Sequence, residues 1–391
     1  MYRVLTHHVK EYGMEPEVVV DVPGVTTILG TFSDLCDGYA LMCTNDQGLR
    51  VAISRRDDMT VKVYNYTIQD RKKFQLAGLK CKPDDKWIGT VKGIFIALQH
   101  DGITLPGMNI SITGRTAHSD YDTLASAVAA GFLIGLNKLL DLGLDMKNML
   151  RLAYASNAYS PGVSRLRDLL TLFVVERKEV VLFDLENYSY EKMANPFDDD
   201  EITSYILDCG MPKNILAEEE RNLHVTMASA IQSFKTNVQR QCKVRDYSLR
   251  DLKFQRAALS EEEMRFTSFA IKESQLVLKA WNALKTKNRD MLCKVFAEQQ
   301  EGVMDYLDFS CPEMEWMYKR CNESSHVYGA TIVYTGLNSG IFLVVGENNL
   351  NVYHNEKLIE YEHIFDFKAT LRHFSPTGGV RILEDDEDII G

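Results

Sequence analysis

The spacing of the apolar residues changes along the chain, and this change limits the folds available to it. The first third alternates short apolar, β-branched runs with turns, at residues 17–22, 49–54, 60–66 and 108–112. Beyond about residue 218, apolar residues recur instead at the i, i+3, i+4 spacing of amphipathic helices. Strands are therefore predicted mainly in the earlier part of the chain and helices mainly in the later part.

Turn residues and polar runs predict how the first strands are connected. Pro23-Gly24 is predicted to end the strand at residues 17–22. The polar run at residues 55–58 is predicted to close a hairpin between the two strands that flank it. Helices are predicted over residues 87–99 and 122–140, and a further strand over residues 179–184.

The second half is predicted to be mainly helical and to end in a β block. The helices are predicted at residues 218–238, 261–285 and 288–299, and Ser260 is a predicted N-cap of the second of them. The β block is predicted over three segments, residues 329–345, 350–354 and 363–375.

Length and composition predict a soluble chain of two domains. The chain has 391 residues, and we place the boundary in the loop at residues 188–200, giving domains 1–190 and 191–391. A net charge of −11 argues against nucleic-acid binding, which depends on clustered Lys and Arg. The apolar run at residues 124–136 is too short to cross a bilayer, and the N-terminus has no signal-peptide pattern, so we expect a cytoplasmic protein without a membrane partner.

The eight cysteines and nine histidines show no metal-ligand spacing. We therefore expect reduced thiols and no bound structural metal.

The segment at residues 22–34 reads V-P-G-V-T-T-I-L-G-T-F-S-D. It resembles, without a gap, the galactokinase signature P-G-R-x-N-L-I-G-E-H-x-D-Y of the GHMP small-molecule kinase family, and residues 37–39 extend the match. Further segments resemble that family in order and spacing, among them Arg56-Asp57-Asp58, Trp87 with Val91-Lys92-Gly93, and Ser310-Cys311-Pro312. In all, the resemblance covers residues 19–383.

This resemblance implies a two-domain α+β fold of the GHMP-kinase type, with the ligand cleft between the domains. It also implies that MgATP and galactose meet in that cleft, where the γ-phosphoryl group passes to the anomeric hydroxyl. Such chemistry needs a base, positive charge on the transferred group and backbone N–H groups around the phosphates. The residues that match the family's site are Asp168 as catalytic base, Asp34, Asp37 and Gly38 for the sugar, and Trp87, Thr123, Ser126 and Gly336 for the nucleotide.

The chain departs from the family where the chemistry takes place. Val25 stands in place of the arginine after Pro-Gly, and Thr31-Phe32 stand in place of the Glu-His pair that binds sugar hydroxyls. The phosphate loop, at residues 117–126, lacks both family glycines and carries Asp120 and Asp122, which we interpret as helix caps.

Several of these residues have an alternative structural interpretation. Asp168 is either a base or the partner of Arg165 in a helix-surface ion pair. Asp34 is either a sugar ligand or a turn residue, and Trp87 either adjoins adenine or packs in the core.

Three functions follow from the sequence. The leading hypothesis is a galactokinase-like protein, catalytically impaired, that acts as a ligand-binding or regulatory relic with a small-molecule or protein partner. The second is an active sugar kinase using ATP and Mg²⁺ on galactose or a related sugar. The third is a scaffold protein that uses the exterior of the fold.

Overall fold

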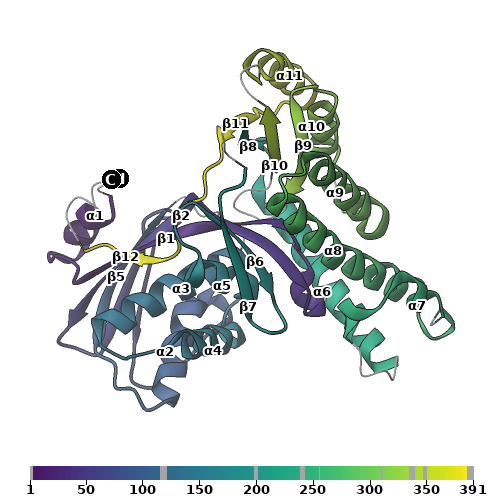
Figure 1. Cartoon of the computed structure of the whole chain (residues 1–391). Coiled ribbons are helices and arrows are strands. Elements are labelled where there is room, and N and C mark those ends of the chain that lie inside the picture. The colour runs from purple at the N-terminus through teal and green to yellow at the C-terminus, as the bar shows by residue number, and fades with distance from the viewer. Residues whose placement is uncertain are drawn as a thin grey trace. The chain divides into compact units, whose positions relative to one another are not determined.

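The computed structural model describes most of the chain (Figure 1). The described residues are 3–114, 121–197, 201–237, 243–254, 256–309, 311–333, 340–346 and 350–384. They form two compact units that interleave along the sequence. Unit 1 comprises Met1–Val25, Thr44–Arg177 and Thr377–Gly391, and unit 2 comprises Thr26–Cys43 and Lys178–Pro376. The boundary placed at residue 190 from the sequence lies within a strand of unit 2, β7 (Ser189–Ala194).

Unit 1 is built on a sheet with the strand order β12-β1-β2-β5-β3-β4. Its strands are β1 (Val18–Leu29), β2 (Tyr39–Arg56), β3 (Thr60–Asn65), β4 (Asp70–Gln75), β5 (Gly107–Gly114) and β12 (Arg381–Ile382). Along the chain, β1 continues into unit 2, and β2 begins in unit 2 and continues into unit 1.

The predicted hairpin between residues 49–54 and 60–66 is wrong, because β5 lies between these two strands. Ile110 of β5 pairs with Ile53 of β2 in antiparallel register and with Val63 of β3 in parallel register. A parallel pair needs a crossover connection, and here the helix α2 (Ile88–His100) lies between β3 and β5 along the chain. The apolar strand β5 thus pairs with both strands and separates them in the sheet.

The predicted strand end at Pro23-Gly24 is also wrong, because β1 continues to Leu29. A β-carbon on Gly24 would lie 2.2 Å from Asn45 Oδ1 and 2.7 Å from the carbonyl oxygen of Gln47. The glycine therefore permits a close approach of β2 instead of turning the chain.

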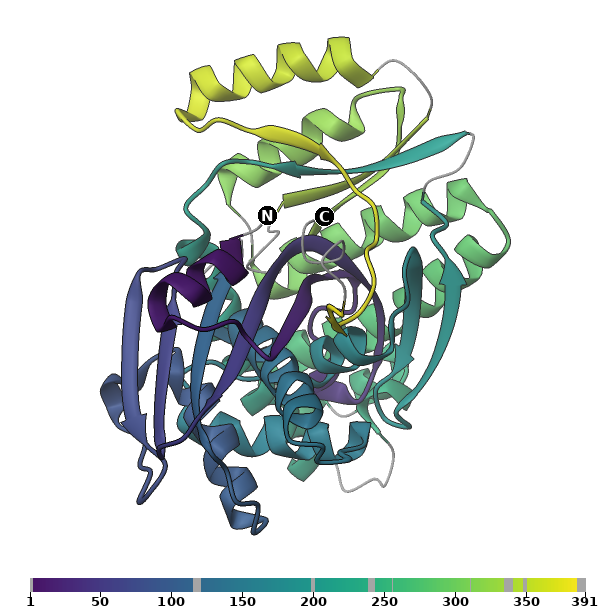
Figure 2. The same cartoon turned by 90° about the vertical axis from the view of Figure 1, so that its left-hand side faces the viewer.

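Helices lie on both faces of the unit 1 sheet, and on one of them the short α1 (Arg3–Tyr12) is the only described helix (Figures 1 and 2). A β-carbon on Gly135 of α3 (Tyr121–Leu139) would lie 2.8 Å from Ile53 Cδ1, so α3 packs closely on that face. The neighbouring Ser54 points to the opposite face, where its hydroxyl bonds His8 of α1 (Arg3–Tyr12). The remaining helices of this unit are α2, α4 (Met146–Ser156) and α5 (Leu166–Val174).

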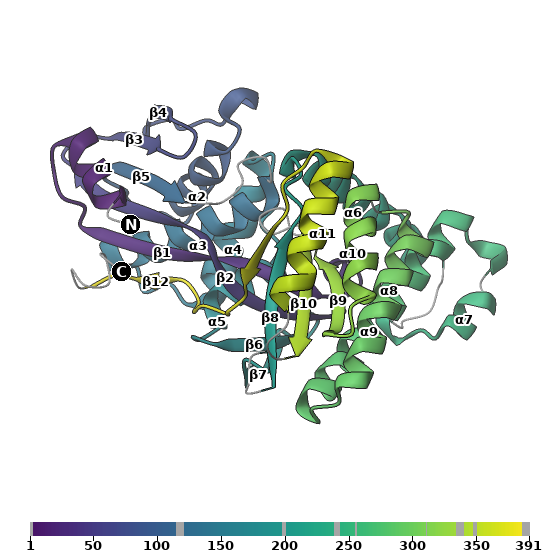
Figure 3. The ribbon, with the colours of Figure 1, turned by 90° about the horizontal axis from the view of Figure 1, so that it is seen from above.

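Unit 2 contains a second sheet with the strand order β11-β8-β10-β9. Its strands are β8 (Ile202–Asp208), β9 (Val327–Val333), β10 (Gly340–Gly346) and β11 (Thr370–His373). In addition, β6 (Glu179–Asp184) pairs with the first residues of β2 on one side and with β7 on the other. Its helices are α6 (Lys213–Asn237), α7 (Leu249–Phe254), α8 (Glu261–Lys285), α9 (Arg289–Gly302), α10 (Pro312–Asn322) and α11 (Leu350–Phe365). Figure 3 shows α8 and α9 side by side next to this sheet.

The N-cap predicted at Ser260, before the helix at residues 261–285, is confirmed. The Ser260 hydroxyl accepts a hydrogen bond from the backbone N–H of Glu263, and the Glu263 carboxylate accepts one from the N–H of Ser260. The helix α8 spans the predicted residues.

The strand predicted at residues 350–354 is wrong, because these residues begin α11. The pattern that the prediction missed lies further on: Leu358, Tyr361 and Phe365 pack against the core of unit 2, and their spacing is helical. Among the described residues, no helix is both long and apolar enough to cross a membrane.

Candidate functional site

Asp168, the predicted catalytic base, lies in the first turn of α5 and is only 5% exposed. Its Oδ1 lies 3.3 Å from Nε of Arg167, and its Oδ2 accepts a 3.4 Å hydrogen bond from the Ser126 hydroxyl of α3. The Ser126 hydroxyl also accepts a hydrogen bond from the backbone N–H of Arg165 at 3.2 Å. The structure therefore brings two predicted site residues, Asp168 and Ser126, into one buried polar cluster in unit 1.

The positive charge in this cluster comes from a residue that we did not single out in the sequence. Arg167 is 2% exposed, so its guanidinium and the carboxylate of Asp168 form a buried ion pair. Removal of either partner of a buried ion pair is destabilising, because it weakens the compensation of the remaining charge. At the position where the family signature has its arginine, Val25 is an apolar side chain that is 4% exposed.

In unit 2, a buried carboxylate holds the segment that carries the sugar signature. Glu273 of α8 is fully buried, and its two oxygens accept hydrogen bonds from the backbone N–H groups of Thr31 (2.9 Å) and Phe32 (3.2 Å). Gln299 of α9 donates a third hydrogen bond to Oε1 at 3.0 Å. A carboxylate that accepts several N–H bonds is stabilised in its charged form and orders the backbone that donates to it.

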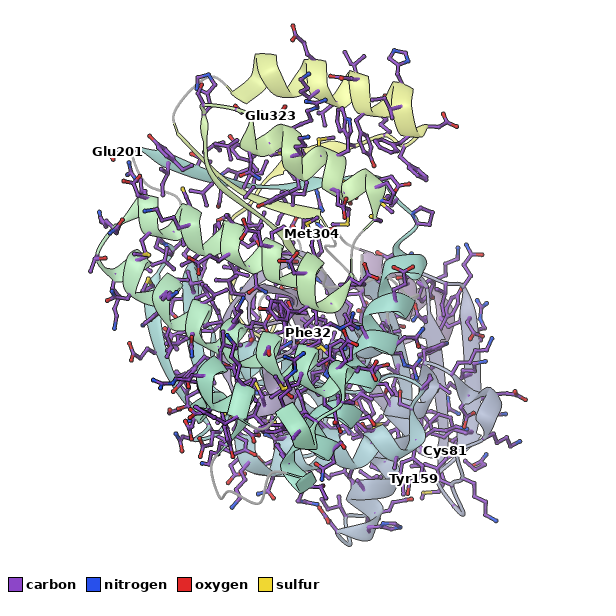
Figure 4. The ribbon with its side chains drawn as sticks, turned by 90° about the vertical axis from the view of Figure 1, so that its right-hand side faces the viewer. Phe32, Cys81, Tyr159, Glu201, Met304 and Glu323 are labelled. Carbon is purple, nitrogen blue, oxygen red and sulfur yellow. The ribbon has the colours of Figure 1, made fainter. Side chains whose placement is uncertain are left out.

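The side chain of Phe32 belongs to the hydrophobic core of unit 2. It is 1% exposed, and its ring centroid lies 6.1 Å from that of Phe269 (Phe32 is labelled in Figure 4). Phe266 and Met227 belong to the same cluster. The position that is a histidine in the family signature is thus occupied here by a core residue.

Of the two predicted sugar-binding aspartates, Asp34 lies in the short helix η1 (Ser33–Cys36) and Asp37 follows it, and both contact α6. Asp34 is hydrogen-bonded to Nε2 of His224, with oxygen–nitrogen distances of 3.4 and 3.3 Å. Asp37 ends η1 in a left-handed conformation, with φ at 53°, and lies 3.6 Å from Nζ of Lys235. Both carboxylates therefore have basic partners on one helix of their own unit.

Gly38 is tightly packed where the chain leaves η1. Its N–H donates to the Ser33 carbonyl at 2.8 Å, and its carbonyl accepts from the N–H of Leu185 at 3.0 Å. A β-carbon at this position would lie 2.4 Å from the Ser274 hydroxyl of α8. Close packing therefore explains why this position is a glycine.

Trp87, a predicted nucleotide contact, lies just before α2 and is 6% exposed. Its indole N–H donates to Asp70 of β4 at 3.0 Å. Thr90, at the position of the family's tyrosine, donates its hydroxyl to Ser160 at 2.9 Å. The described contacts of Trp87 are thus those of a core tryptophan with its polar edge satisfied.

The remaining nucleotide candidates are described only in part. Thr123 lies within α3, and Gly336 and Asp120 lie outside the described residues. Of the expected ATP contacts with described side chains, Ser126 is engaged by Asp168, and Trp87 is buried against the protein. The described contacts of these two side chains are thus with the protein itself. Within that part, no group of three or more His, Cys, Asp or Glu residues could hold a metal ion.

Sequence reasoning missed three residues of these clusters: Arg167, Glu273 and His224. A signal for Glu273 was present, because it lies in the apolar stripe that Phe266, Ala270 and Val277 form along α8. A carboxylate at such a position has to find buried hydrogen-bond donors. His224 gave no comparable signal, because its partner lies 190 residues away in the sequence.

Comparison with known proteins supports the resemblance to galactokinases. Residues 6–55 match the model of the galactokinase galactose-binding signature. A protein of Treponema pallidum (strain Nichols), provisionally named a galactokinase, is 25% identical over 394 residues, which cover 98% of this chain and 97% of that protein. The galactokinase of Pyrococcus furiosus is 21% identical over 367 residues, covering 94% of this chain and 99% of the relative.

Solved structures show the same fold. The structure of Lactococcus lactis galactokinase complexed with galactose matches with a TM-score of 0.86 at 18% identity, covering 97% of this chain and 98% of that one. The Methanococcus jannaschii mevalonate kinase matches with a TM-score of 0.57 at 13% identity, covering 93% and 99%. The fold is thus the two-domain α+β fold of the GHMP small-molecule kinases. These comparisons support membership of the galactokinase/GHMP kinase family.

Proposed function

We propose that this chain is a galactokinase-like protein with impaired phosphoryl transfer, and that it acts as a ligand-binding or regulatory protein. The observation that carries the proposal is the use of residues 31 and 32. In the family signature these positions hold the Glu-His pair, whereas here Phe32 packs in the core of unit 2 and the backbone of both residues is bonded to Glu273. A site built on hydrogen bonds to substrate hydroxyls loses much of its specificity when such groups are absent.

The apolar residue at position 25 supports the same proposal. An arginine that stabilises the charge of the transferred phosphoryl group is worth about 10³–10⁵ in rate. Val25 is buried in β1 and offers neither charge nor hydrogen-bond donor from its side chain. The valine at this position therefore favours a ligand-binding function over catalysis of phosphoryl transfer.

A second candidate function, an active ATP- and Mg²⁺-dependent sugar kinase, is favoured by the cluster around Asp168. A buried carboxylate that neighbouring side chains hold in place is the kind of group that serves as a general base. Arg167 and Ser126 hold Asp168 in this way. On this alternative, Asp168 accepts the proton of the sugar's anomeric hydroxyl, and bound ATP supplies the phosphoryl group.

The two candidates are separated by ADP release from the purified full chain with MgATP and a panel of sugars that includes galactose. If phosphoryl transfer is impaired, the wild type and the Asp168→Asn variant release ADP at the same sugar-dependent rate. Sugar-dependent turnover that Asp168→Asn abolishes would overturn the proposal in favour of the kinase. Asp57→Asn, at an exposed position of unit 1, is the matched control and leaves any such rate unchanged.

Thermal unfolding in the presence of each ligand tests binding independently of turnover. A ligand that binds only the folded state stabilises it by about 2.7 kcal/mol at one hundred times its dissociation constant. Stabilisation by galactose without ADP release is the expected result. Absence of any shift with galactose, the related sugars or MgATP would remove the ligand-binding role.

A further inference from the structure

Positive charge gathers in one segment of unit 1, although the chain as a whole is acidic. Residues 55–86 contain nine Lys or Arg and five Asp or Glu, so their net charge is +4. Because the whole chain carries a net charge of −11, the rest of it carries −15. A local excess of positive charge on an acidic protein attracts acidic partners.

Two lysines of this segment face each other across neighbouring strands. Lys62 of β3 lies directly opposite Lys73 of β4 in antiparallel register, and Lys73 is exposed. Among the described residues, neither ammonium group has an ion-pair partner, since the nearby Glu11 of α1 is bonded to Arg71 at 2.7 Å. Like charges directly opposite each other destabilise a sheet. An anion that lies against this pair would therefore stabilise it.

The strand β4 is also an open edge of the sheet. It ends the strand order β12-β1-β2-β5-β3-β4, and no described strand pairs with its outer side. Figure 3 shows β4 and β12 at opposite sides of this sheet. Arg71, Lys72 and Lys73 follow one another along β4, so positive charge points to both faces of the edge. Such charges keep neutral or basic strands away from an edge and leave it open to an acidic extended segment.

The chain itself carries an acidic segment of this kind in unit 1. Residues 384–388 read E-D-D-E-D, the longest acidic run in the sequence, and they follow β12. The side chain of Glu384 is 71% exposed, and its 3.5 Å contact with the exposed Lys138 is of a kind that contributes little to stability. The rest of the run lies outside the described residues.

The acidic segment falls short of the basic edge of its own chain. Both belong to unit 1, where five strand spacings of about 4.8 Å place β4 about 24 Å from β12. Five residues span at most about 18 Å when fully extended. On one face the way is also crossed by α1, whose Val4 packs with Leu383. A second copy of the chain has no such limit of reach.

We propose that the basic surface formed by Lys62, Arg71 and Lys73 binds the acidic segment 384–388 of a second copy of this chain. The surface of one copy contacts a different part of the next, so the association is head to tail. Its ion pairs are exposed, and salt therefore weakens it. The inference goes beyond the proposed function and depends on neither sugar binding nor phosphoryl transfer.

The test is sedimentation equilibrium of the full chain over a range of protein concentrations. At low salt the weight-average mass is expected to rise above 44.5 kDa with concentration, and in about 0.3 M salt it is expected to return to that value. Lys62→Glu/Lys73→Glu is expected to weaken the association about tenfold or more, because two attractions become repulsions. The matched control, which changes the net charge equally at exposed positions elsewhere, is Lys147→Glu/Lys253→Glu.

Two further measurements examine the acidic segment. Neutralisation of its aspartates and glutamate beyond Glu384 is expected to weaken the association as strongly, in the variant Asp385→Asn/Asp386→Asn/Glu387→Gln/Asp388→Asn. An unlabelled peptide of residues 383–391, added to the wild type, is expected to disperse the assembly. This competition uses the unaltered chain, so the proposal stays testable even if a variant misfolds.

Three results would overturn the inference. One is a wild-type chain that stays monomeric at low salt. Another is an association that the peptide leaves intact, or that the lysine variant and its control weaken equally. The third is stronger association of Lys62→Glu/Lys73→Glu than of the wild type, because the lysines would then only keep other strands away from the edge.

Discussion

Replacement of Glu273 by alanine is expected to destabilise unit 2 strongly. The carboxylate is fully buried and accepts hydrogen bonds from the N–H groups of Thr31 and Phe32 and from the side chain of Gln299. Each buried donor left without a partner costs about 1–3 kcal/mol, although water entering the space will satisfy part of the loss. We therefore expect Glu273→Ala to lower the free energy of unfolding by about 3–5 kcal/mol.

Two further variants provide comparisons for the stability loss expected of Glu273→Ala. Glu273→Gln keeps one acceptor oxygen but turns an amide donor toward the remaining N–H groups, so about 2 kcal/mol is expected. Glu298→Ala removes an exposed carboxylate 3.4 Å from Lys279, whose contribution is expected to be within about 1 kcal/mol.

The assay is urea denaturation followed by circular dichroism, with calorimetry as a second measurement. For a domain of 150–250 residues, each kcal/mol corresponds to a shift of about 2–4 °C in the unfolding temperature. The reasoning is refuted if Glu273→Ala is no more destabilising than Glu298→Ala, because the three hydrogen bonds would then have no net effect.

Further predictions concern unit 1. Burial lowers the pKa of His8 from its ordinary 6.5 to about 4, so the folded chain binds fewer protons than the unfolded chain between these values. Stability is therefore expected to fall as the pH falls through this window, by up to about 3 kcal/mol, and a pH series in which His8→Gln shows the same slope would contradict this. Gly24→Ala places a β-carbon 2.7 Å from a carbonyl oxygen and is expected to cost about 1–3 kcal/mol in thermal unfolding, whereas Gly378→Ala, with its nearest atom at 3.6 Å, costs less; equal effects would count against the packing argument. Arg167→Met is expected to cost about 3–5 kcal/mol in urea denaturation, with partial recovery when Asp168→Asn is added, and an additive double variant would show that the two residues are not coupled.

The sequence predicted the elements whose signal is local. The cap at Ser260, the helix that follows it and the long helix α3 follow from side chains within a few residues of one another. The fold class followed from the order of family-like segments, because that order persists where single residues have changed. Strand pairing was less predictable, because the insertion of β5 between β2 and β3 depends on contacts distant in sequence.

Prediction of the candidate site was limited in the same way, by contacts between residues distant in sequence. Asp168 and Ser126 could be named from their places in family-like segments, and the structure joins them. Glu273 and His224 contact the signature segment from 242 and 190 residues away, so no local pattern linked them to it. The burial of Phe32 was likewise invisible, because an aromatic residue in a loop motif can stack on a ligand or pack in a core.

The proposed loss of phosphoryl transfer is tested most directly by following product formation. Purified full chain is incubated with MgATP and galactose, and ³¹P NMR records the appearance of a sugar phosphate, with Asp168→Asn measured in parallel. We predict that the two proteins give the same signal, at the level of the enzyme-free reaction. A sugar phosphate that accumulates to many times the protein concentration with the wild type, and not with Asp168→Asn, would contradict the proposal and establish an active kinase.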